Sequence, residues 1–277
     1  MKLFLADNSL RPAYGGPAHS VSQLATALAE AGVRVGLWAA DQSAAATTLL
    51  SADSPVQRLM GSPRKALNSF GIVDVLHDNG IWLSHNHRLA QLSAERGIPR
   101  VVSTRGMLEP SAMYHGRLKK RVAWLLYQRR DLVRAHWHHT TADGEASNLR
   151  RLKLGVPVRV IANGVDVRQG GLAPGMREAR KRNARQRTAL FLGPIYAVKG
   201  LPWLIEAWAR VRPNGWSLRI AGPDDAGHRA EMESAVLAAG LGEIISSSDR
   251  SRVKRSALHC STRIFWCCRR TPKAPAR

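Results

Sequence analysis

Two adjacent glycines are the first residues whose spacing suggests chemistry. Gly15 and Gly16 follow the first apolar run of the chain and precede a helical pattern that begins at Pro17. Glycines at such a junction let the backbone approach a ligand closely, and the amides at the start of the helix attract a phosphate. A simple tight turn between a strand and a helix also favours glycine. The pair therefore predicts either a phosphate-binding turn or a purely structural one.

A glycine and a lysine stand in a similar place farther along the chain. Gly193 ends the apolar run 189–193, and Lys199 follows after a short loop, directly before Gly200. A lysine beyond the carboxyl end of a parallel strand is placed to neutralise a diphosphate. A charge that is merely solvated in the loop is the alternative. The segment from Asn163 to Asp166, taken alone, predicts only a turn.

Regular elements must bring these residues together. Over residues 1–165, short apolar runs alternate with amphipathic stretches, which is typical of a parallel sheet covered by helices on both faces. The expected strands are 2–6, 33–39, 73–77, 100–104, 137–141 and 158–162. The expected helices are 17–31, 86–96 and 144–154, the last with Asp143 as its N-cap. This part of the chain predicts an α/β domain of Rossmann type.

The rest of the chain divides into three segments. Residues 166–187 are rich in glycine, proline and basic residues and are expected to be an interdomain linker. Residues 188–245 resume the alternation, with strands at 189–193 and 217–221 and helices at 201–211 and 227–239. Residues 246–277 show neither the helical nor the strand period, so we expect an irregular tail. The second α/β domain is therefore predicted to be incomplete, because two strands do not close a doubly wound sheet.

Composition excludes some classes of protein. The 277 residues carry a formal charge of +22, concentrated at 117–134, at 177–187 and after residue 250. A nucleic-acid binder would interleave such charges with exposed aromatic side chains, whereas Trp124, Trp203, Trp208 and Trp216 fall at expected core or family positions. The three cysteines, Cys260, Cys267 and Cys268, lack the spacing of a zinc site. We expect neither nucleic acid nor metal as a partner.

The start of the chain and its hydropathy bear on location. No run of about 18 apolar residues occurs, and the first residues reach Asp7 too early for a signal peptide. A cytoplasmic protein is therefore expected. The basic segment 117–134 interleaves leucine and valine with lysine and arginine, which suits an anionic membrane surface at the inner face of the membrane. Alternatively, its apolar stripe packs on the sheet and its charges face water.

Taken in order, these segments resemble family-four glycosyltransferases of the GT-B fold, particularly those that extend bacterial surface polysaccharides. The resemblance covers residues 1–245. It rests on Gly15-Gly16, on 74–82 (DVLHDNGIW), on 103–110 (STRGMLEP) with Lys119-Lys120, on 161–166 (IANGVD), on 191–193 with 199–201, and on 216–223. It implies two Rossmann-like domains, the second incomplete here, and transfer of a hexose with retention at the anomeric carbon.

The resemblance also implies roles for single residues. Gly15, Gly16 and Gly193 would face the phosphates of a nucleotide-sugar donor, and Lys199 would neutralise them without a bound metal or other cofactor. The acceptor, a glycan or a lipid-linked glycan, would lie near His77, Arg105, Lys119 and Lys120. Many relatives carry a histidine where Arg105 stands. For His77 the alternative is a structural histidine whose ring is satisfied by the backbone.

The chain departs from the family pattern in the second domain. Relatives carry an arginine in the donor-phosphate loop where this chain has Pro194, and two glutamates seven residues apart that are absent here. One of the two basic residues that would bind the donor phosphates is therefore missing, as is the glutamate that would bind the donor ribose. The sequence predicts very weak transfer or none, and the alternative function is a non-catalytic remnant that binds an acceptor or a membrane.

The tail supports a specific explanation for these absences. If the reading frame is shifted by one nucleotide, the genetic code forces Trp266 to become leucine, Cys267 to become valine and Cys268 to become leucine. The shifted frame permits Ala-Asp-Leu-Leu-Val-Leu-Pro-Ser, a pattern typical of a buried strand such as relatives have before the first glutamate. We therefore hypothesise a single-nucleotide frameshift near Ser246.

Overall fold

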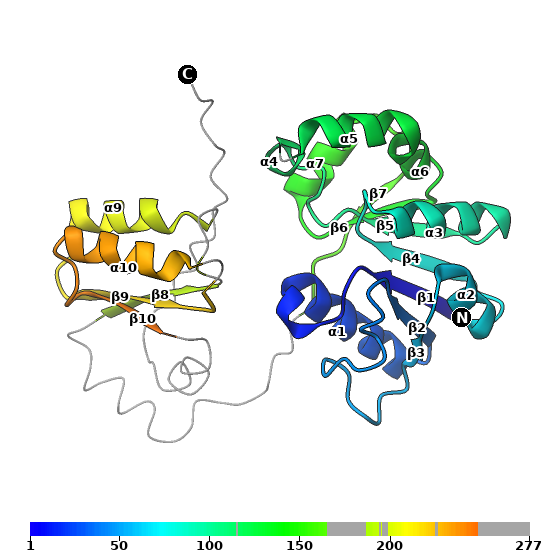
Figure 1. The fold of residues 1–277 in the computed structure, drawn as a ribbon, viewed down its shortest axis with the longest axis horizontal. Helices are drawn as coiled ribbons and strands as arrows, with labels where there is room; N and C mark the ends of the chain where they lie inside the picture. Colours follow the sequence, from blue (N-terminus) through cyan, green and yellow to red (C-terminus); the bar gives the residue numbers. More distant parts are fainter. Residues whose placement is uncertain (115, 165–186, 194, 196–198, 225–226, 249–277) are drawn as a thin grey trace. The chain divides into compact units, whose positions relative to one another are not determined.

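The computed structural model describes residues 1–114, 116–164, 187–193, 195, 199–224 and 227–248. The chain divides into two compact units, Met1–Asp166 and Val167–Arg277 (Figure 1). The expected linker 166–187 lies almost wholly outside the described residues, as does the tail from residue 249 onward.

A seven-stranded parallel sheet forms the centre of the first unit, with strand order β3-β2-β1-β4-β5-β6-β7. Its strands are β1 (Lys2–Asp7), β2 (Arg34–Ala39), β3 (Gln57–Leu59), β4 (Val75–Asn79), β5 (Arg100–Ser103), β6 (Trp137–Thr140) and β7 (Val158–Val160). The chain moves outward from β1 to β3 and returns on the other side of β1 as β4. This reversal creates the switch point at which doubly wound folds place ligands, outside the carboxyl ends of the strands.

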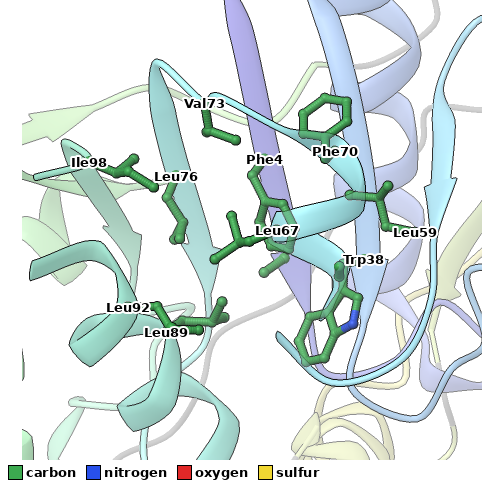
Figure 2. Packing of buried hydrophobic residues seen from close by; sticks show 12 residues of the cluster. Phe4, Trp38, Leu59, Leu67, Phe70, Val73, Leu76, Leu89, Leu92 and Ile98 are labelled. Carbon is green, nitrogen blue, oxygen red and sulfur yellow. The ribbon is translucent and has the colours of Figure 1, made fainter. Parts of the chain in front are cut away.

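Helices cover both faces of this sheet. They are the 3-10 helix η1 (Pro12–Tyr14), α1 (Gly16–Glu30), α2 (Pro63–Phe70), α3 (Ser84–Glu95), α4 (Pro110–Tyr114), α5 (Arg117–Ala123), the π-helical turn η2 (Trp124–Gln128), α6 (Arg129–Val133) and α7 (Asp143–Arg151). Because side chains alternate along a strand, Phe4 packs with Leu67 and Leu89 of α2 and α3 (Figure 2), whereas Leu5 packs with Val21 of α1 on the opposite face.

The second unit has a three-stranded parallel sheet of order β10-β9-β8 among its described residues. The strands are β8 (Arg187–Leu192), β9 (Trp216–Ala221) and β10 (Ile245–Ser248), and α9 (Leu201–Val211) and α10 (His228–Ala238) lie together on one face of the sheet (Figure 1). Phe191, Ile205, Ile220 and Val236 belong to its buried core. The unit is a further β/α arrangement of Rossmann type.

The structure confirms the predicted α/β alternation and corrects it in detail. The first sheet contains β3, and α2 follows it; neither was predicted. Ser246–Ser248, expected to be irregular, continue β10 and pair with β9. Asp143 is the first residue of α7 and not its N-cap, which is Ala142. Trp203, expected at a core or family position, is exposed, because Leu201 and Ile205 form the buried side of α9.

No helix in the described part of the chain is long and apolar enough to cross a membrane.

Candidate functional site

Polar residues gather where the central strands of the first sheet end. The parallel register sets Ala6 beside Asp78, Asn79 beside Ser103, and Ser103 beside His139. The carboxyl ends of β1, β4, β5 and β6 therefore meet at one edge. This is the edge at which a ligand is expected in a doubly wound fold.

Arg105 follows β5 and is fixed at this edge. Its Nε and one terminal nitrogen donate to Oδ1 of Asn79 at 3.2 and 2.6 Å, and the other terminal nitrogen donates to Oδ1 of Asn163 at 3.2 Å. Burial lowers the pKa of Arg105, while the carboxylates of Asp7 and Glu145 act in the opposite direction. Arginine keeps its charge in proteins, so the edge holds a positioned cation.

Glu145 organises the loop that carries Arg105. This buried carboxylate, in the first turn of α7, accepts hydrogen bonds from Oγ1 of Thr104 at 2.7 Å and from the backbone N–H of Gly106 at 2.6 Å. It also accepts from the N–H of Thr141 at 3.1 Å. The loop places Arg105 in the left-handed region, with φ +50°. Sequence reasoning missed Glu145, whose only signal was an acid early in an expected helix.

Asp7 contributes a buried carboxyl group to the same edge. Its Oδ1 accepts the backbone N–H of Asn8 at 2.7 Å, and its Oδ2 has no hydrogen-bond partner among the residues that the structure describes. Burial raises the pKa of Asp7 to about 7, against the lowering effects of the Asn8 hydrogen bond and of Arg105. The group therefore changes charge near neutral pH.

His77 lies within the sheet and is linked to the next two strands. Its Nε2 is 2.7 Å from Oγ of Ser103, which is 2.7 Å from Nδ1 of His139, and Nε2 of His139 is 2.9 Å from the carbonyl oxygen of Ile161. A carbonyl only accepts, so Nε2 of His139 donates. For neutral rings, Ser103 then donates to His139 and accepts from His77.

This arrangement bears on the two interpretations of His77. Burial, followed by repulsion from His139 and Arg105, lowers the pKa of His77 to about 3, so the ring is neutral at physiological pH. Its hydrogen bond goes to a serine hydroxyl and not to the backbone. His77 is buried, whereas Arg105, whose charge acts on it, is only partly buried.

The Gly15-Gly16 turn ends the loop after β1 and begins α1. Gly15 is the N-cap with φ +86°, a conformation that strongly favours glycine. Gly16 is the first helical residue and is not in the positive-φ region. A Cβ added at either position would have no atom within 4 Å. Backbone conformation therefore accounts for the glycine at position 15, whereas neither a positive φ nor close packing requires one at position 16.

In the second unit, Gly193 and Lys199 flank the loop between β8 and α9. The N–H of Gly193 donates to the carbonyl of Ala221 at 2.9 Å and so extends the ladder beyond β8. Lys199 is partly buried and precedes Gly200, the N-cap of α9, which has φ +74°. Both residues thus lie where a strand ends and a helix begins. Pro194 lies outside the described residues.

The two lysines of α5 have different environments. Nζ of Lys120 donates to the carbonyl of Ala112 at 2.5 Å and lies 5.8 Å from the ring centroid of Trp82. Lys120 therefore ties α5 to α4 and to the loop after β4, whereas Lys119 is exposed. Within the described residues, no group of three or more His, Cys, Asp or Glu side chains could hold a metal ion.

Several solved structures share the fold of this chain. The chain superposes on Anabaena Alr3699/HepE in complex with UDP and glucose (TM-score 0.62, 18% identity, 90% of this chain and 69% of that chain). It also matches sucrose-phosphate synthase of Thermosynechococcus elongatus (TM-score 0.71, 18% identity, 94% and 73%). A third match is the lipopolysaccharide outer core galactosyltransferase WaaB (TM-score 0.58, 11% identity, 93% and 70%). No curated protein matches the sequence.

These neighbours and the two Rossmann-like units define the class of fold, the α/β GT-B fold. The family model described as Glycosyltransferase Family 4 matches residues 14–169, which is more than half of the 277 residues. The chain belongs to glycosyltransferase family 4.

Proposed function

We propose that this chain is a retaining hexosyltransferase, which moves a hexose from a nucleotide sugar to a glycan or lipid-linked acceptor in surface polysaccharide synthesis. Family membership supports the reaction class. Neighbours of the same fold were solved with UDP and with UDP-glucose, which favours a uridine diphosphate donor. We place the reaction on the cytoplasmic side of the membrane, where such an acceptor would be presented.

Gly16 is the observation that carries the donor site in this proposal. A side chain there would meet open space, and the close approach of a ligand would account for its absence. The backbone amides at the start of α1 would stabilise the diphosphate as it leaves. Such stabilisation needs no metal ion.

Arg105 and Asn79 would hold acceptor hydroxyl groups at the neighbouring strand ends. A guanidinium group offers five N–H donors in a fixed plane, and the hydrogen bonds to Asn79 and Asn163 set its orientation. We propose that His77 orients the hydroxyl of Ser103 through their hydrogen bond. Its buried ring is poorly placed to contact a sugar directly.

The rate of transfer by this chain should be very low or zero. Pro194 stands where relatives carry the second cation of the phosphate loop. The alternative function, a remnant that binds acceptor or membrane without catalysis, predicts acceptor binding with little affinity for nucleotides.

Calorimetric titration of the full chain with UDP, together with a transfer assay using radiolabelled UDP-glucose, tests the proposal. We expect measurable UDP binding that is lost in Gly16→Ala, and transfer far below ordinary enzyme rates. Absence of UDP binding to the folded wild type would refute the donor site. Transfer at ordinary enzyme rates would support the proposed reaction and refute the prediction that the rate is very low.

A further inference from the structure

The segment from α5 to α6 presents two different faces. Its inner face is bound to the loop after β4: the hydroxyl of Tyr127 donates to the carbonyl of Trp82 at 2.8 Å, and Oε1 of Gln128 accepts the N–H of Trp82 at 2.8 Å. The rings of Trp124 and Trp82 lie 6.2 Å apart, and Leu132 is buried in the core beneath. These contacts fix the orientation of the whole segment on the first unit.

The outer face is apolar and exposed. Leu118, Val122, Leu125 and Leu126 expose 78%, 56%, 83% and 75% of their surface, and Tyr114 in α4 exposes 67%. Positions 118, 122, 125 and 126 recur at the spacing of one helix face. The interpretation in which this stripe packs on the sheet is therefore wrong, because Trp124, Tyr127, Gln128 and Leu132 occupy the inner face instead. Figure 1 shows α5 running across the end of the first unit.

Basic residues surround this apolar face. Lys120 is turned inward toward Ala112 and Trp82, but six other basic residues of the segment 117–134 are exposed: Arg117, Lys119, Arg121, Arg129, Arg130 and Arg134. The single acid of the segment, Asp131, is buried and bonded to Nδ1 of His87 at 2.7 Å, so it faces inward. An exposed apolar stripe flanked by one sign of charge is complementary to a surface that is both apolar and anionic.

We propose that the outer face of residues 114–130 binds the anionic surface of a lipid bilayer. The exposed leucines enter the boundary between headgroups and acyl chains, and the flanking arginines and lysines meet the lipid phosphates. This inference rests on the proposed function, in which a lipid-linked acceptor is held in a membrane. It assigns the contact with that membrane to a defined surface. Vesicle binding is nevertheless measured without donor or acceptor, so the two proposals fail separately.

The position of this surface in the chain links it to the acceptor side. The loop that carries Arg105 leads directly into α4, which begins at Pro110, and α5 follows. A bilayer that contacts α4 and α5 therefore lies against elements continuous with the Arg105 loop. Such an arrangement suits an acceptor that is held in a membrane by a lipid.

Sedimentation of the full chain with vesicles tests the proposal. We expect binding to phosphatidylcholine vesicles that contain phosphatidylglycerol and much weaker binding to phosphatidylcholine alone. The double variant Leu118→Gln/Leu125→Gln should reduce partitioning about tenfold or more, because both side chains leave the apolar boundary. Ile72→Gln is the matched control, since Ile72 is 89% exposed in the same unit but outside this face. It should bind as the wild type does.

The charges require a second pair of variants. Arg129→Gln/Arg130→Gln should weaken binding to anionic vesicles by about tenfold or more, because each basic residue near an anionic surface contributes about 1 kcal/mol. Arg34→Gln, an exposed arginine at the start of β2, should have no effect. Circular dichroism of every variant establishes that it is folded.

Three outcomes would overturn the proposal. One is equal binding of the wild type to anionic and neutral vesicles. Another is equal binding of the leucine variant and of the Ile72 control. The third is a wild-type dimer in light scattering that the leucine variant converts to a monomer, without any vesicle binding, because the face would then bind a second copy of the chain.

Discussion

The guanidinium group of Arg105 donates two hydrogen bonds to Oδ1 of Asn79, at 2.6 and 3.2 Å, and so joins the ends of β4 and β5. Neither residue reaches this geometry alone. Arg105 has φ +50°, and Glu145 holds the residues on both sides of it through Thr104 and Gly106. The position of Arg105 thus depends on the carboxylate of Glu145.

Replacing Glu145 tests this dependence. Glu145→Gln leaves the shape nearly unchanged, but one carboxylate acceptor becomes an NH2 group that faces other donors. We expect a loss of about 1–3 kcal/mol in the free energy of unfolding, measured by urea denaturation. Glu95→Gln is the control, because its exposed pair with Arg64 contributes about 0–1 kcal/mol at most. Equal effects of the two variants would contradict the assigned role.

The two adjacent glycines should respond differently to alanine. Gly15→Ala should lower stability by about 1 kcal/mol or more, because alanine is strained at φ +86°. Gly16→Ala should leave the melting temperature unchanged or slightly higher and should weaken UDP binding at least tenfold. Gly144→Ala, in open space in the first turn of α7, is the control for both measurements. UDP binding of Gly16→Ala at wild-type strength would leave Gly16 without a function.

Lys199 is expected to contribute to the donor site through its charge. Lys199→Gln should weaken UDP binding roughly tenfold to hundredfold, because a hydrogen bond to a charged group contributes about 1.5–3 kcal/mol. Arg210→Gln removes an exposed charge from the same unit, where Arg210 pairs with Glu206 at 2.6 Å, and should not change UDP binding. Calorimetry on both variants measures the difference. If Lys199 were only solvated in the loop, both variants would bind UDP with the affinity of the wild type.

The buried carboxyl of Asp7 should make stability depend on pH. Its pKa is raised to about 7 in the folded protein, from 3.8, so the folded state binds the proton more tightly than the unfolded chain. The stability contribution of Asp7 is therefore present in full below about pH 4 and is lost as pH rises toward 7, with a slope of at most about 1.4 kcal/mol per pH unit.

Comparison of the wild type with Asp7→Asn isolates this contribution. Urea denaturation at several pH values between 4 and 8 should show the wild type losing stability relative to the variant as pH rises. The comparison cancels the buried histidines, which titrate in both proteins, and it includes the repulsion between Asp7 and Asp78, whose pKa is also raised to about 7. Parallel stability curves for the two proteins would show that Asp7 ionises normally.

The frameshift hypothesis makes a prediction about the gene. Reading its nucleotides one base out of frame from near Ser246 should continue into a strand, two glutamates seven residues apart and a closing helix. Strand β10 is regular as far as Ser248, so we expect the reading frame to change in this region. Stop codons soon after the shift, or a shifted frame without the glutamates, would contradict the hypothesis.

The sequence by itself determined the class of fold and the order of the motifs, because both are local. Apolar runs alternating with amphipathic stretches specify strands and helices through their own periodicity, and Gly15 marks a turn by its backbone freedom. The short strand β3 was missed because three residues carry no detectable period. Ser246 and its neighbours were missed as a strand because pairing with β9, and not an apolar pattern, makes them regular.

Only the tertiary structure decided the contacts between distant segments. Glu145 meets Thr104 because the ends of β5 and β6 are adjacent, and no sequence period records that adjacency. The segment 117–133 has apolar residues on both faces, so its pattern did not reveal which face is buried. The fit of Trp124 and Tyr127 around Trp82 determines the inner face and leaves Leu118 and Leu125 exposed. That choice depends on packing between distant parts of the chain.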